Sequence, residues 1–476
     1  MSQPSRIFMI GILPTCDYHD VGKFLMKQLY NKDIYDVNKP VESYWEDVSS
    51  IDQNKYPKLV GDQSCDVCVI GGGFTGISTA YHIAKNYGGD VRVLEAGHYG
   101  FASSARNAGF CCLPATKLST TQLIKKFGME ETKKFFSSQI EGVELLSSII
   151  SENNIDCEKV GDGNLDVAHH PGSSEELKEW GNELKEYFGI NTKWIPKEEF
   201  DEVGHQSTEQ FGAVFTEAGF AMNPMAFMRG FASATVDAGA KLHSFSRVKK
   251  WERNGSHKLI TDGGSITANK VVVATNGYTD ESLHPSFANR MMPVLSNIIV
   301  TREMSDDEFK LQNYKTLNPI CNSREILYYY RRMPSNRMLF GTRGDTYGDD
   351  ASALKMREFM TQKFRGVFPN WNNIDIDHYW RGTVVMTRDF VPAFGALDDD
   401  KSVLFSYGYQ ANGNNTTVYC GKKLAEMIYE SNSGETNISK VYQGLSPKIP
   451  LGFLRLWYLR LYLWYSNFTD KSKKEI

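Results

Sequence analysis

The chain has 476 residues, of which 41% are hydrophobic and 23% charged, and its formal net charge is −4. A chain of this length and composition can bury a large core, and its length suggests two or three domains. The lack of a basic excess argues against nucleic acid as a partner. The eight cysteines are scattered, and Cys65-x-x-Cys68 lies in an apolar run. We therefore expect structural cysteines rather than a disulfide framework or a metal site.

Residues 1–60 form an N-terminal extension whose role the sequence does not reveal. Its apolar stretch, Ile7 to Leu13, is too short to span a bilayer, and Arg6 is the only basic residue before it. No small-residue cleavage site follows the stretch, so a secretory signal is not supported. We expect a cytoplasmic protein.

Residues 65–97 have the order of a buried strand, a glycine turn, a helix and a second strand. The turn Gly71–Gly76 contains the pattern G-x-G-x-x-G, and it follows the apolar run Cys65–Ile70. Glycines in such a turn permit a tight bend and a close approach to a pyrophosphate, which then lies at the positive end of the helix. Glu95 ends the second strand, where a carboxylate accepts hydrogen bonds from ribose hydroxyls. The segment predicts a dinucleotide-binding fold that disfavours a 2′-phosphate.

The rest of the chain predicts further helices and strands around this fold. Residues 291–345 alternate apolar and polar side chains in several runs, which indicates an antiparallel sheet with one solvated face. The fold class is therefore α/β (α+β overall), with a Rossmann-like domain built from separated pieces and a sheet-containing domain inserted between them. The other expected elements are helices over 119–150, 174–190, 351–365 and 416–429, and strands within 211–220, 241–274 and 402–409.

A loop of small residues, Ala102–Phe110, follows the nucleotide-binding segment. Together with Cys65–Gly97 it resembles the D-amino-acid oxidase-like FAD-dependent oxidoreductases. Within that family it is most similar to the gamma-glutamylputrescine oxidoreductase group, which has Ser-Gly-Arg-Asn-Gly-Gly where this chain has Ser104–Gly109. The resemblance covers roughly residues 42–465. Further matching segments are Tyr44-Trp45, Ala274–Tyr278, Trp380-x-Gly382 with Thr387 and Pro392, and Gly408-Tyr409 before Gly413.

The resemblance implies FAD as the cofactor. One complete glycine pattern agrees with this, because a flavoprotein that also uses a nicotinamide would need a second. No attachment motif accompanies Cys111 and Cys112, so we expect non-covalent FAD. The residues expected at the cofactor are Gly71, Gly73, Phe74, Thr75, Gly76, Glu95, Ala96, Ser103, Ser104, Arg106, Asn107, Ala108, Gly109, Val248, Ala274, Thr275, Asn276, Gly277, Gly382, Tyr409, Gln410, Asn412, Gly413, Asn414, Asn415 and Thr416.

The resemblance also implies a reaction, namely oxidation of the C–N bond of an amine or amino acid. Hydride passes from the α-carbon to flavin N5, and water hydrolyses the imine to an aldehyde or keto product. Oxygen or another acceptor then takes the electrons. The candidate catalytic residues are Arg106, Tyr328, Tyr330 and Arg381, although sheet packing also explains the tyrosines and a surface role also explains Arg381.

Two other functions stay open at this point. One is a dehydrogenase of the same fold that passes electrons to a quinone or a carrier protein. The other is a non-catalytic flavin-fold binding protein. Relatives often have a Gly-His-Gly run where this chain has residues 410–415, so a mechanism that needs that histidine is not supported.

The C-terminal tail is unusual in composition. Leu451–Phe468 is rich in Leu, Trp and Tyr, and its only charges are Arg455 and Arg460. Packing against the body, an oligomer contact and contact with a membrane surface are three open interpretations.

Seven segments summarise the expected organisation. They are the N-terminal extension (1–60), three parts of the FAD-binding domain (61–118, 206–288 and 376–446), two parts of the substrate domain (119–205 and 289–375) and the apolar C-terminal tail (447–476).

Overall fold

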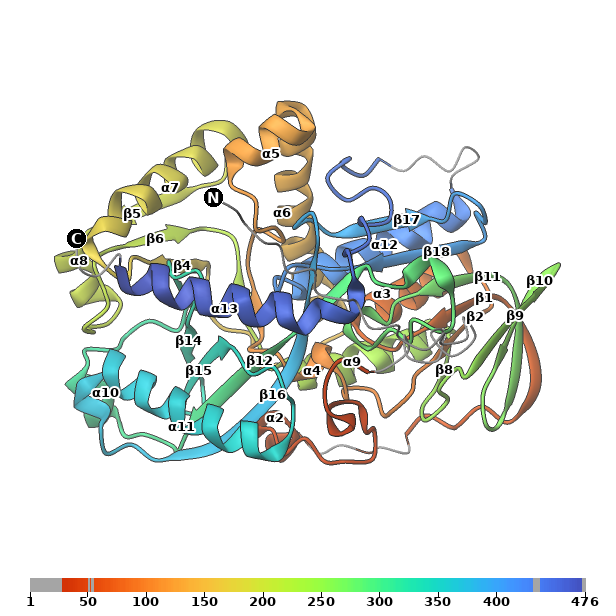
Figure 1. Cartoon of the computed structure of the whole chain (residues 1–476), viewed down its shortest axis with the longest axis horizontal. Coiled ribbons are helices and arrows are strands. Elements are labelled where there is room, and N and C mark those ends of the chain that lie inside the picture. The colour runs from red at the N-terminus through yellow and green to blue at the C-terminus, as the bar shows by residue number, and fades with distance from the viewer. Residues whose placement is uncertain (1–27, 50–51, 53–54, 431–436, 473–476) are drawn as a thin grey trace, which may run out of the picture.

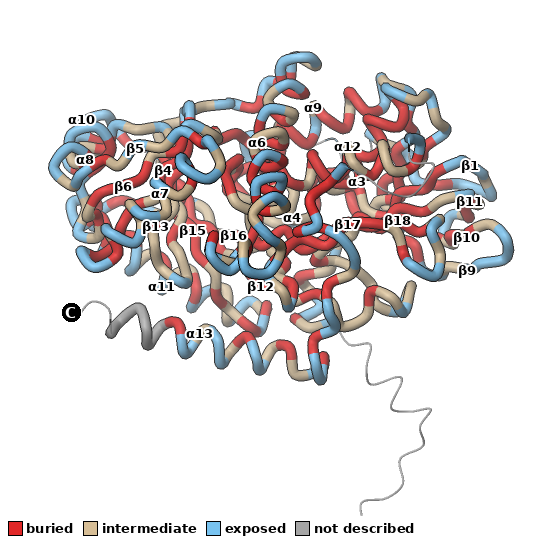
Figure 2. The backbone as a smooth tube through the Cα atoms, turned by 90° about the horizontal axis from the view of Figure 1, so that it is seen from above, coloured by how far each residue is buried: buried red, intermediate tan, exposed pale blue. Residues whose placement is uncertain are grey.

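The computed structural model describes residues 28–49, 52, 55–430 and 437–472, with side chains described as far as residue 466. Two eight-stranded sheets lie side by side, with helices packed around them (Figure 1). The burial view shows the strands of both sheets largely buried and the exposed residues gathered on helices and loops (Figure 2). The apolar stretch Ile7–Leu13 lies outside the described residues.

The first sheet is mainly parallel and carries the glycine turn. The second half of β1 is buried on both faces, as its unbroken apolar run predicts. Five strands, in the order β18-β11-β1-β2-β8, pair in parallel. In spatial order the strands are β17 (Ala393–Ala396), β18 (Val403–Tyr407), β11 (Gly264–Val273), β1 (Gly61–Ile70), β2 (Val91–Leu94) and β8 (Lys241–His243), with β10 (Ser256–Ile260) and β9 (Lys250–Asn254) branching antiparallel from β11.

The second sheet is mainly antiparallel, as the alternating pattern predicts. Long strands β12 and β16 pair along almost their whole length and form the edge nearest the first sheet. In spatial order its strands are β16 (Ile376–Thr387), β12 (Met291–Thr301), β15 (Met338–Arg343), β14 (Tyr329–Arg332), β13 (Ile320–Asn322), β4 (Asn164–Val167), β6 (Ala213–Thr216) and β5 (Thr192–Ile195), and the short pair β3 (Phe110–Cys111) and β7 (Phe220–Ala221) stands apart.

Helices cover both sheets. On the first sheet, α3 (Phe74–His82) starts at the glycine turn and packs against α12 (Asn414–Tyr429) and α9 (Pro224–Asp237). It continues into a π-turn, Ile83–Tyr87, and ends at Gly88 in the left-handed conformation. The other helices are α2 (Tyr44–Val48), α4 (Ser103–Arg106), α5 (Thr120–Phe127), α6 (Met129–Glu152), α7 (Ser174–Phe188), α8 (Lys197–Val203), α10 (Asp306–Leu311), α11 (Asp350–Val367) and α13 (Arg455–Ser472).

The fold class predicted from the sequence is confirmed: a parallel nucleotide-binding sheet stands beside an antiparallel one. Strand pairing differs from the expected ranges in two places. Both β6 and β16 pair within the second sheet, whereas the expected ranges put them in parts of the FAD-binding domain. Neither strand carries a sequence signal that tells which sheet it joins, because only the pairing partner decides it.

Candidate cofactor and substrate site

The glycine turn is shaped by close backbone approaches. Gly71 has φ +103°, and a Cβ there would lie 2.8 Å from the carbonyl oxygen of Ala274. A Cβ on Gly76 would lie 1.9 Å from the carbonyl oxygen of Gly71. Any larger residue at either position would force the β1–α3 turn open. Since Gly73 caps α3 without a side chain, the first turn of the helix presents its backbone to the adjoining cavity.

Glu95 is held by backbone donors at the end of β2. Its carboxylate accepts hydrogen bonds from the N–H of Gly72 (2.7 Å) and the N–H of Gly97 (2.9 Å). Burial raises the pKa of Glu95 above its usual range, and these backbone N–H groups act in the opposite direction. The carboxylate is thus fixed at the cavity wall, where it can accept from a ribose.

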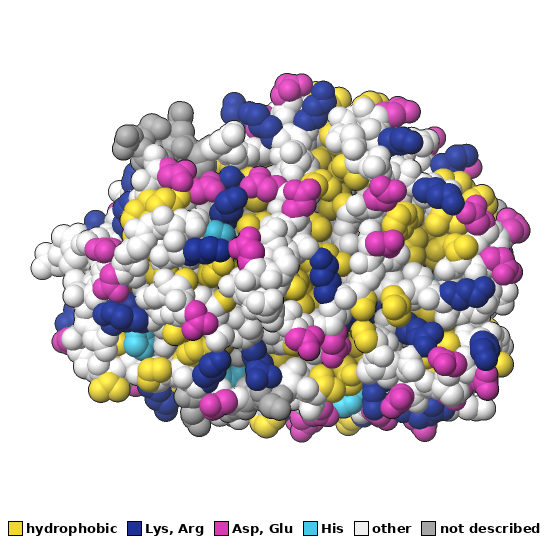
Figure 3. Space-filling model, turned by 180° about the vertical axis from the view of Figure 1, so that it is seen from behind, with side chains coloured by type: hydrophobic (Ala, Val, Ile, Leu, Met, Phe, Trp, Pro, Cys, Tyr) yellow, Lys and Arg dark blue, Asp and Glu magenta, His cyan; other side chains and the backbone are white. Residues whose placement is uncertain are grey.

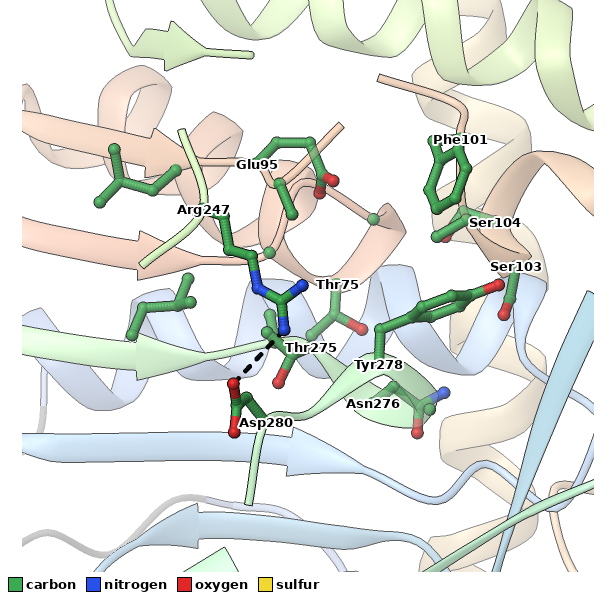
Figure 4. Close-up of a pocket in the computed structure, with 18 of the residues that line it drawn as sticks. Thr75, Glu95, Phe101, Ser103, Ser104, Arg247, Thr275, Asn276, Tyr278 and Asp280 are labelled. Atoms are coloured by element: carbon green, nitrogen blue, oxygen red, sulfur yellow. Dashed lines mark hydrogen bonds and ion pairs between the residues drawn. The ribbon is translucent and has the colours of Figure 1, made fainter. Parts of the chain in front are cut away.

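A first cavity of about 130 Å³ opens at this turn. Figure 4 shows Glu95 at one side of the cavity, Asn276 and Tyr278 at the other, and Thr75 close to Thr275 between them. Arg247 extends from the side of Glu95 toward Asp280, at 3.4 Å. Fourteen of the residues expected at the cofactor line this cavity: Gly71, Gly73, Phe74, Thr75, Glu95, Ala96, Ser103, Ser104, Val248, Ala274, Thr275, Asn276, Gly277 and Tyr409.

These residues fit the adenosine and pyrophosphate end of a dinucleotide. The N-cap of α3 is a glycine, and although the Ser104 hydroxyl accepts from the N–H of Phe74 at 3.0 Å, the positive end of the helix suits phosphates. The anchored carboxylate of Glu95 suits the ribose. Sequence reasoning missed Tyr35, Arg247 and Tyr278, which also line the cavity. Arg247 directly precedes Val248, which was expected at the cofactor, so its position in the sequence could have indicated that it lines the cavity. Tyr35 belongs to the N-terminal extension, so no local pattern connects it to the turn.

A second cavity, of about 270 Å³, adjoins the first and shares six lining residues with it: Phe74, Ser103, Ser104, Asn276, Tyr409 and Thr417. We call it the chamber. Its wall includes the loop Ala102–Phe110 around α4, which we call the α4 loop. The resemblance places the flavin ring beside this loop. The expected cofactor residues that line only the chamber are Arg106, Asn107, Ala108, Gly382, Gln410, Asn412, Gly413 and Asn414.

Four expected residues lie outside both cavities. Gly76 and Gly109 serve close packing, since a Cβ on Gly109 would lie 1.8 Å from the carbonyl oxygen of Met222. Asn415 and Thr416 are fully buried at the start of α12. Both side chains hydrogen-bond to Gln139 of α6, so Thr417, one position on, faces the cavities instead.

The chamber extends along one face of the second sheet. Gly382, Ser296 and Arg343 are direct partners across β16, β12 and β15, and direct partners project on the same face. Adjacent strands lie about 4.8 Å apart, so Arg343 stands about 10 Å from Gly382 along the sheet. A Cβ on Gly382 would lie 3.1 Å from Cβ of Arg106, which places the α4 loop against β16.

Three ionisable side chains line the part of the chamber away from β16: Lys117, Asp166 and Arg343. Solvent reaches the side chain of Lys117 through the open chamber, and protein atoms lie around it on the other sides. Burial, and then the nearby Arg343, lowers the pKa of Lys117 to about 7. Burial raises the pKa of Asp166 to about 7, against the hydrogen bond from Asn164 and the charge of Lys117. Two cationic groups and one acid therefore share this wall.

The candidate catalytic residues fall into different places. Tyr328 and Tyr330 are buried in the core on the other side of the sheet, where the hydroxyl of Tyr330 lies 3.0 Å from Nε2 of His205. Tyr329 lines the chamber instead, 2.7 Å from the hydroxyl of Ser296. The sequence prediction named Tyr328 and Tyr330 as catalytic candidates, and the structure corrects this, because side chains alternate along the strand and both of these face the core.

The two arginines serve mainly as structural ties. Arg381 bonds to Asp345 at 2.8 Å and donates to the carbonyl oxygens of Gly348 and Asp349, so it holds the loop before α11. Arg106 lines the chamber, but its guanidinium donates to the carbonyl oxygens of Phe101 and Arg381. It therefore fixes the α4 loop against β16.

Two tryptophans also hold this loop from outside the cavities. The indole N–H of Trp45 donates to the carbonyl oxygen of Asn107 at 2.9 Å, and that of Trp380 donates to the carbonyl oxygen of Arg106 at 2.8 Å. Both side chains are fully buried. The N-terminal extension thus helps to hold the α4 loop in place. In the sequence, the only indication of this contact was the family match at Tyr44-Trp45.

Similarity to known proteins shows the family to which the chain belongs. The family model described as FAD dependent oxidoreductase matches residues 66–427. The chain belongs to this family of FAD-dependent oxidoreductases. It is 31% identical to gamma-glutamylputrescine oxidoreductase of Escherichia coli over 77% of this chain and 84% of that protein. It is also 29% identical to the probable oxidoreductase OrdL of Haemophilus influenzae, over 86% and 92%.

Solved structures agree in fold with this FAD-dependent oxidoreductase. Glycine oxidase from Geobacillus kaustophilus superimposes with a TM-score of 0.65 at 19% identity, over 78% of this chain and 97% of that one. L-proline dehydrogenase from P. horikoshii superimposes with a TM-score of 0.65 at 20% identity, over 80% of this chain and 96% of that one. Across the described part of the chain, no helix has both the length and the apolar character needed to cross a membrane.

Proposed function

We propose that this enzyme oxidises the C–N bond of an extended amine that carries a carboxylate at its far end. The chamber supports this proposal because it starts at the α4 loop and continues to the wall formed by Lys117, Asp166 and Arg343. Non-covalently bound FAD would supply the two-electron acceptor for the hydrogen on the carbon next to nitrogen. The oxidised substrate is an imine, which water hydrolyses to an aldehyde or keto product and an amine or ammonia.

In this proposal the residues of the chain bind and orient the substrate. The α4 loop, tied down by Trp45, Trp380 and Arg106, forms the end of the chamber where the C–N bond lies. A carboxylate accepts hydrogen bonds from Lys117 and Arg343 at the other end, and charge-assisted bonds of this kind are the strong ones. Binding energy gathered at the charged end then positions the reacting carbon.

Size favours an extended substrate over a small α-amino acid. Arg343 lies about 10 Å along the sheet from Gly382, a residue expected at the flavin, so a carboxylate bound to Arg343 lies well away from the reacting carbon. Gamma-glutamylputrescine, the compound named in the Escherichia coli relative, has this build, with an amine at one end and an α-carboxylate at the other. Glycine, named in the glycine oxidase matches, is much shorter.

The test is anaerobic reduction of the purified holoenzyme by a matched set of amines. The set is gamma-glutamylputrescine, putrescine without the glutamyl carboxylate, 4-aminobutanoate and glycine, with bleaching of the flavin absorbance and the aldehyde product as readouts. We expect gamma-glutamylputrescine to have a kcat/KM about 100-fold above that of putrescine, which lacks the charge-assisted bonds. Glycine or putrescine as the best substrate would overturn the proposal.

A further inference from the structure

The last helix, α13, and the turn before it expose many large apolar side chains. It crosses the front of the molecule in dark blue (Figure 1) and runs along the outside of the body when the molecule is seen from above (Figure 2). Eight of the twenty exposed large apolar side chains among the described residues fall in 451–465. Large exposed patches of this kind mark interaction sites. The eight are Leu451, Phe453, Trp457, Tyr458, Leu461, Tyr462, Trp464 and Tyr465.

The face of α13 that meets the body holds Arg455 and Arg460, the only charged residues between Arg455 and Ser466. Arg455 is buried and pairs with Glu281 at 2.6 Å, and it also donates to the carbonyl oxygen of Met291 at 2.8 Å. Arg460 donates to the hydroxyl of Thr346 at 3.0 Å. Leu459 lies between them and is 5% exposed. The helix is thereby fixed along the surface, with both arginines turned to the protein.

The outward face is uncharged and rich in aromatic rings. With 3.6 residues per turn, Trp457, Leu461 and Trp464 project within one quarter of the circumference of α13. They are 59%, 62% and 70% exposed, and Phe453, in the short 3-10 turn before α13, is 64% exposed. Trp457 and Trp464 are also the only exposed tryptophans among the described residues. On the opposite side of the molecule, by contrast, basic and acidic side chains are interspersed (Figure 3).

Charge favours a lipid surface as the occupant of this face. An interfacial helix lies in the membrane plane with Trp and Leu in the headgroup region, and basic residues beside it attract anionic lipids. In the sequence, Lys448 precedes α13, and residues 470–475 include three lysines against one aspartate and one glutamate. A helix of 18 residues is about 27 Å long, which provides a row of anchors along the surface.

We propose that the outward face of α13 binds the protein to the surface of a lipid bilayer that contains anionic lipids. The exposed side chains of Phe453, Trp457, Leu461 and Trp464 would enter the headgroup boundary, while Arg455 and Arg460 keep the helix fixed to the body. This proposal concerns a surface distinct from the chamber, and it stands whether or not the proposed substrate is correct.

The test is co-sedimentation of the full-length holoenzyme with vesicles of phosphatidylcholine mixed with phosphatidylglycerol. We expect the wild-type enzyme to bind, and the triple substitution Trp457→Ser, Leu461→Ser and Trp464→Ser to weaken binding by about 100-fold or more, because it removes three large apolar side chains from the lipid contact. The matched control is Leu354→Ser on α11, which is 69% exposed and should bind as the wild type does. Retained flavin absorbance verifies that each variant is folded.

Two results would overturn the proposal. One is a wild-type enzyme that stays in the supernatant with these vesicles. The other is a dimer in light scattering that the triple substitution converts to a monomer, with equal vesicle binding by both forms, because that would make a second copy the occupant. A shift of tryptophan fluorescence to shorter wavelength on addition of vesicles, lost in the triple variant, would support the lipid contact independently.

Discussion

The first cavity, at the glycine turn, and the chamber are built from different parts of the chain. We call the first cavity the nucleotide cleft. The cleft is a backbone structure: Gly71, Gly76 and the N–H groups of Gly72 and Gly97 shape it or hold Glu95. The chamber is a side-chain structure, assembled from strands that meet only through sheet pairing. The cleft should therefore be damaged by added bulk, whereas the chamber should change its specificity when charges are removed.

The largest effect is expected from added bulk in the cleft. Gly71→Val combines an unfavourable positive φ with overlap on the carbonyl oxygen of Ala274, each worth about 1–3 kcal/mol. We expect FAD affinity to fall by about 100-fold or more, measured from the flavin absorbance of the purified protein. Gly366→Ala on α11 is the control, because its added Cβ meets nothing within 4 Å, and it should keep its full FAD content. A yellow Gly71→Val protein with normal affinity would contradict the account of the turn.

A smaller and more selective effect is expected from removing charge in the chamber. Lys117→Met combined with Arg343→Met should raise KM for gamma-glutamylputrescine by about 100-fold, because hydrogen bonds to charged groups contribute about 1.5–3 kcal/mol each. The same variant should oxidise putrescine as well as the wild type does. Lys249→Met, which removes an exposed ion pair with Asp262, is the control and should change neither KM. Equal losses for both substrates would show that the two cations support the fold rather than specificity.

The contrast also explains what the sequence could predict. Gly71–Gly76 and Glu95 lie within one strand–turn–helix–strand unit, so their spacing alone indicated the nucleotide fold. Lys117, Asp166 and Arg343 are far apart in the chain, and each is an ordinary charged residue in its local context. Only the register of the second sheet places Arg343 opposite Ser296, and Ser296 in turn opposite Gly382.

Other details depended on packing that a pattern does not contain. The run Tyr328–Tyr330 predicted a strand with alternating faces, but the core under His205 decides that Tyr330 points inward. Asn415 and Thr416 follow the expected loop, yet Gln139 of α6 takes both side chains away from the cavities. The N-terminal extension gave no sign of its contact with the α4 loop apart from the family match at Trp45.

The pH dependence of binding sharpens the assignment of charge. Lys117 and Asp166 both have a pKa of about 7, so a rise in pH removes a positive charge and adds a negative one in the chamber. Both changes disfavour a carboxylate. KM for gamma-glutamylputrescine should therefore be lowest below pH 7 and rise by about tenfold above it, corresponding to about 1.4 kcal/mol. In Lys117→Met with Asp166→Asn the KM profile should be flat, and an unchanged pH profile in that variant would assign the titration to other groups.

The smallest effect separates the neighbouring tyrosines. Tyr329→Phe removes the chamber hydroxyl next to Ser296, and a neutral hydrogen bond is worth about 1 kcal/mol, so kcat/KM should fall about fivefold. Tyr330→Phe removes only the contact with His205 in the core and should lower the free energy of unfolding slightly with no change in kcat/KM. Equal kinetic losses in the two variants would contradict the alternation of faces.

The central claim is that one continuous site joins bound FAD to an amine-oxidising chamber. The most direct measurement mixes the purified holoenzyme with gamma-glutamylputrescine without oxygen and follows the flavin absorbance and the aldehyde formed in a single turnover. The account predicts full bleaching with one aldehyde formed for each FAD. Flavin that stays oxidised with this compound and with every other amine in the set would contradict it.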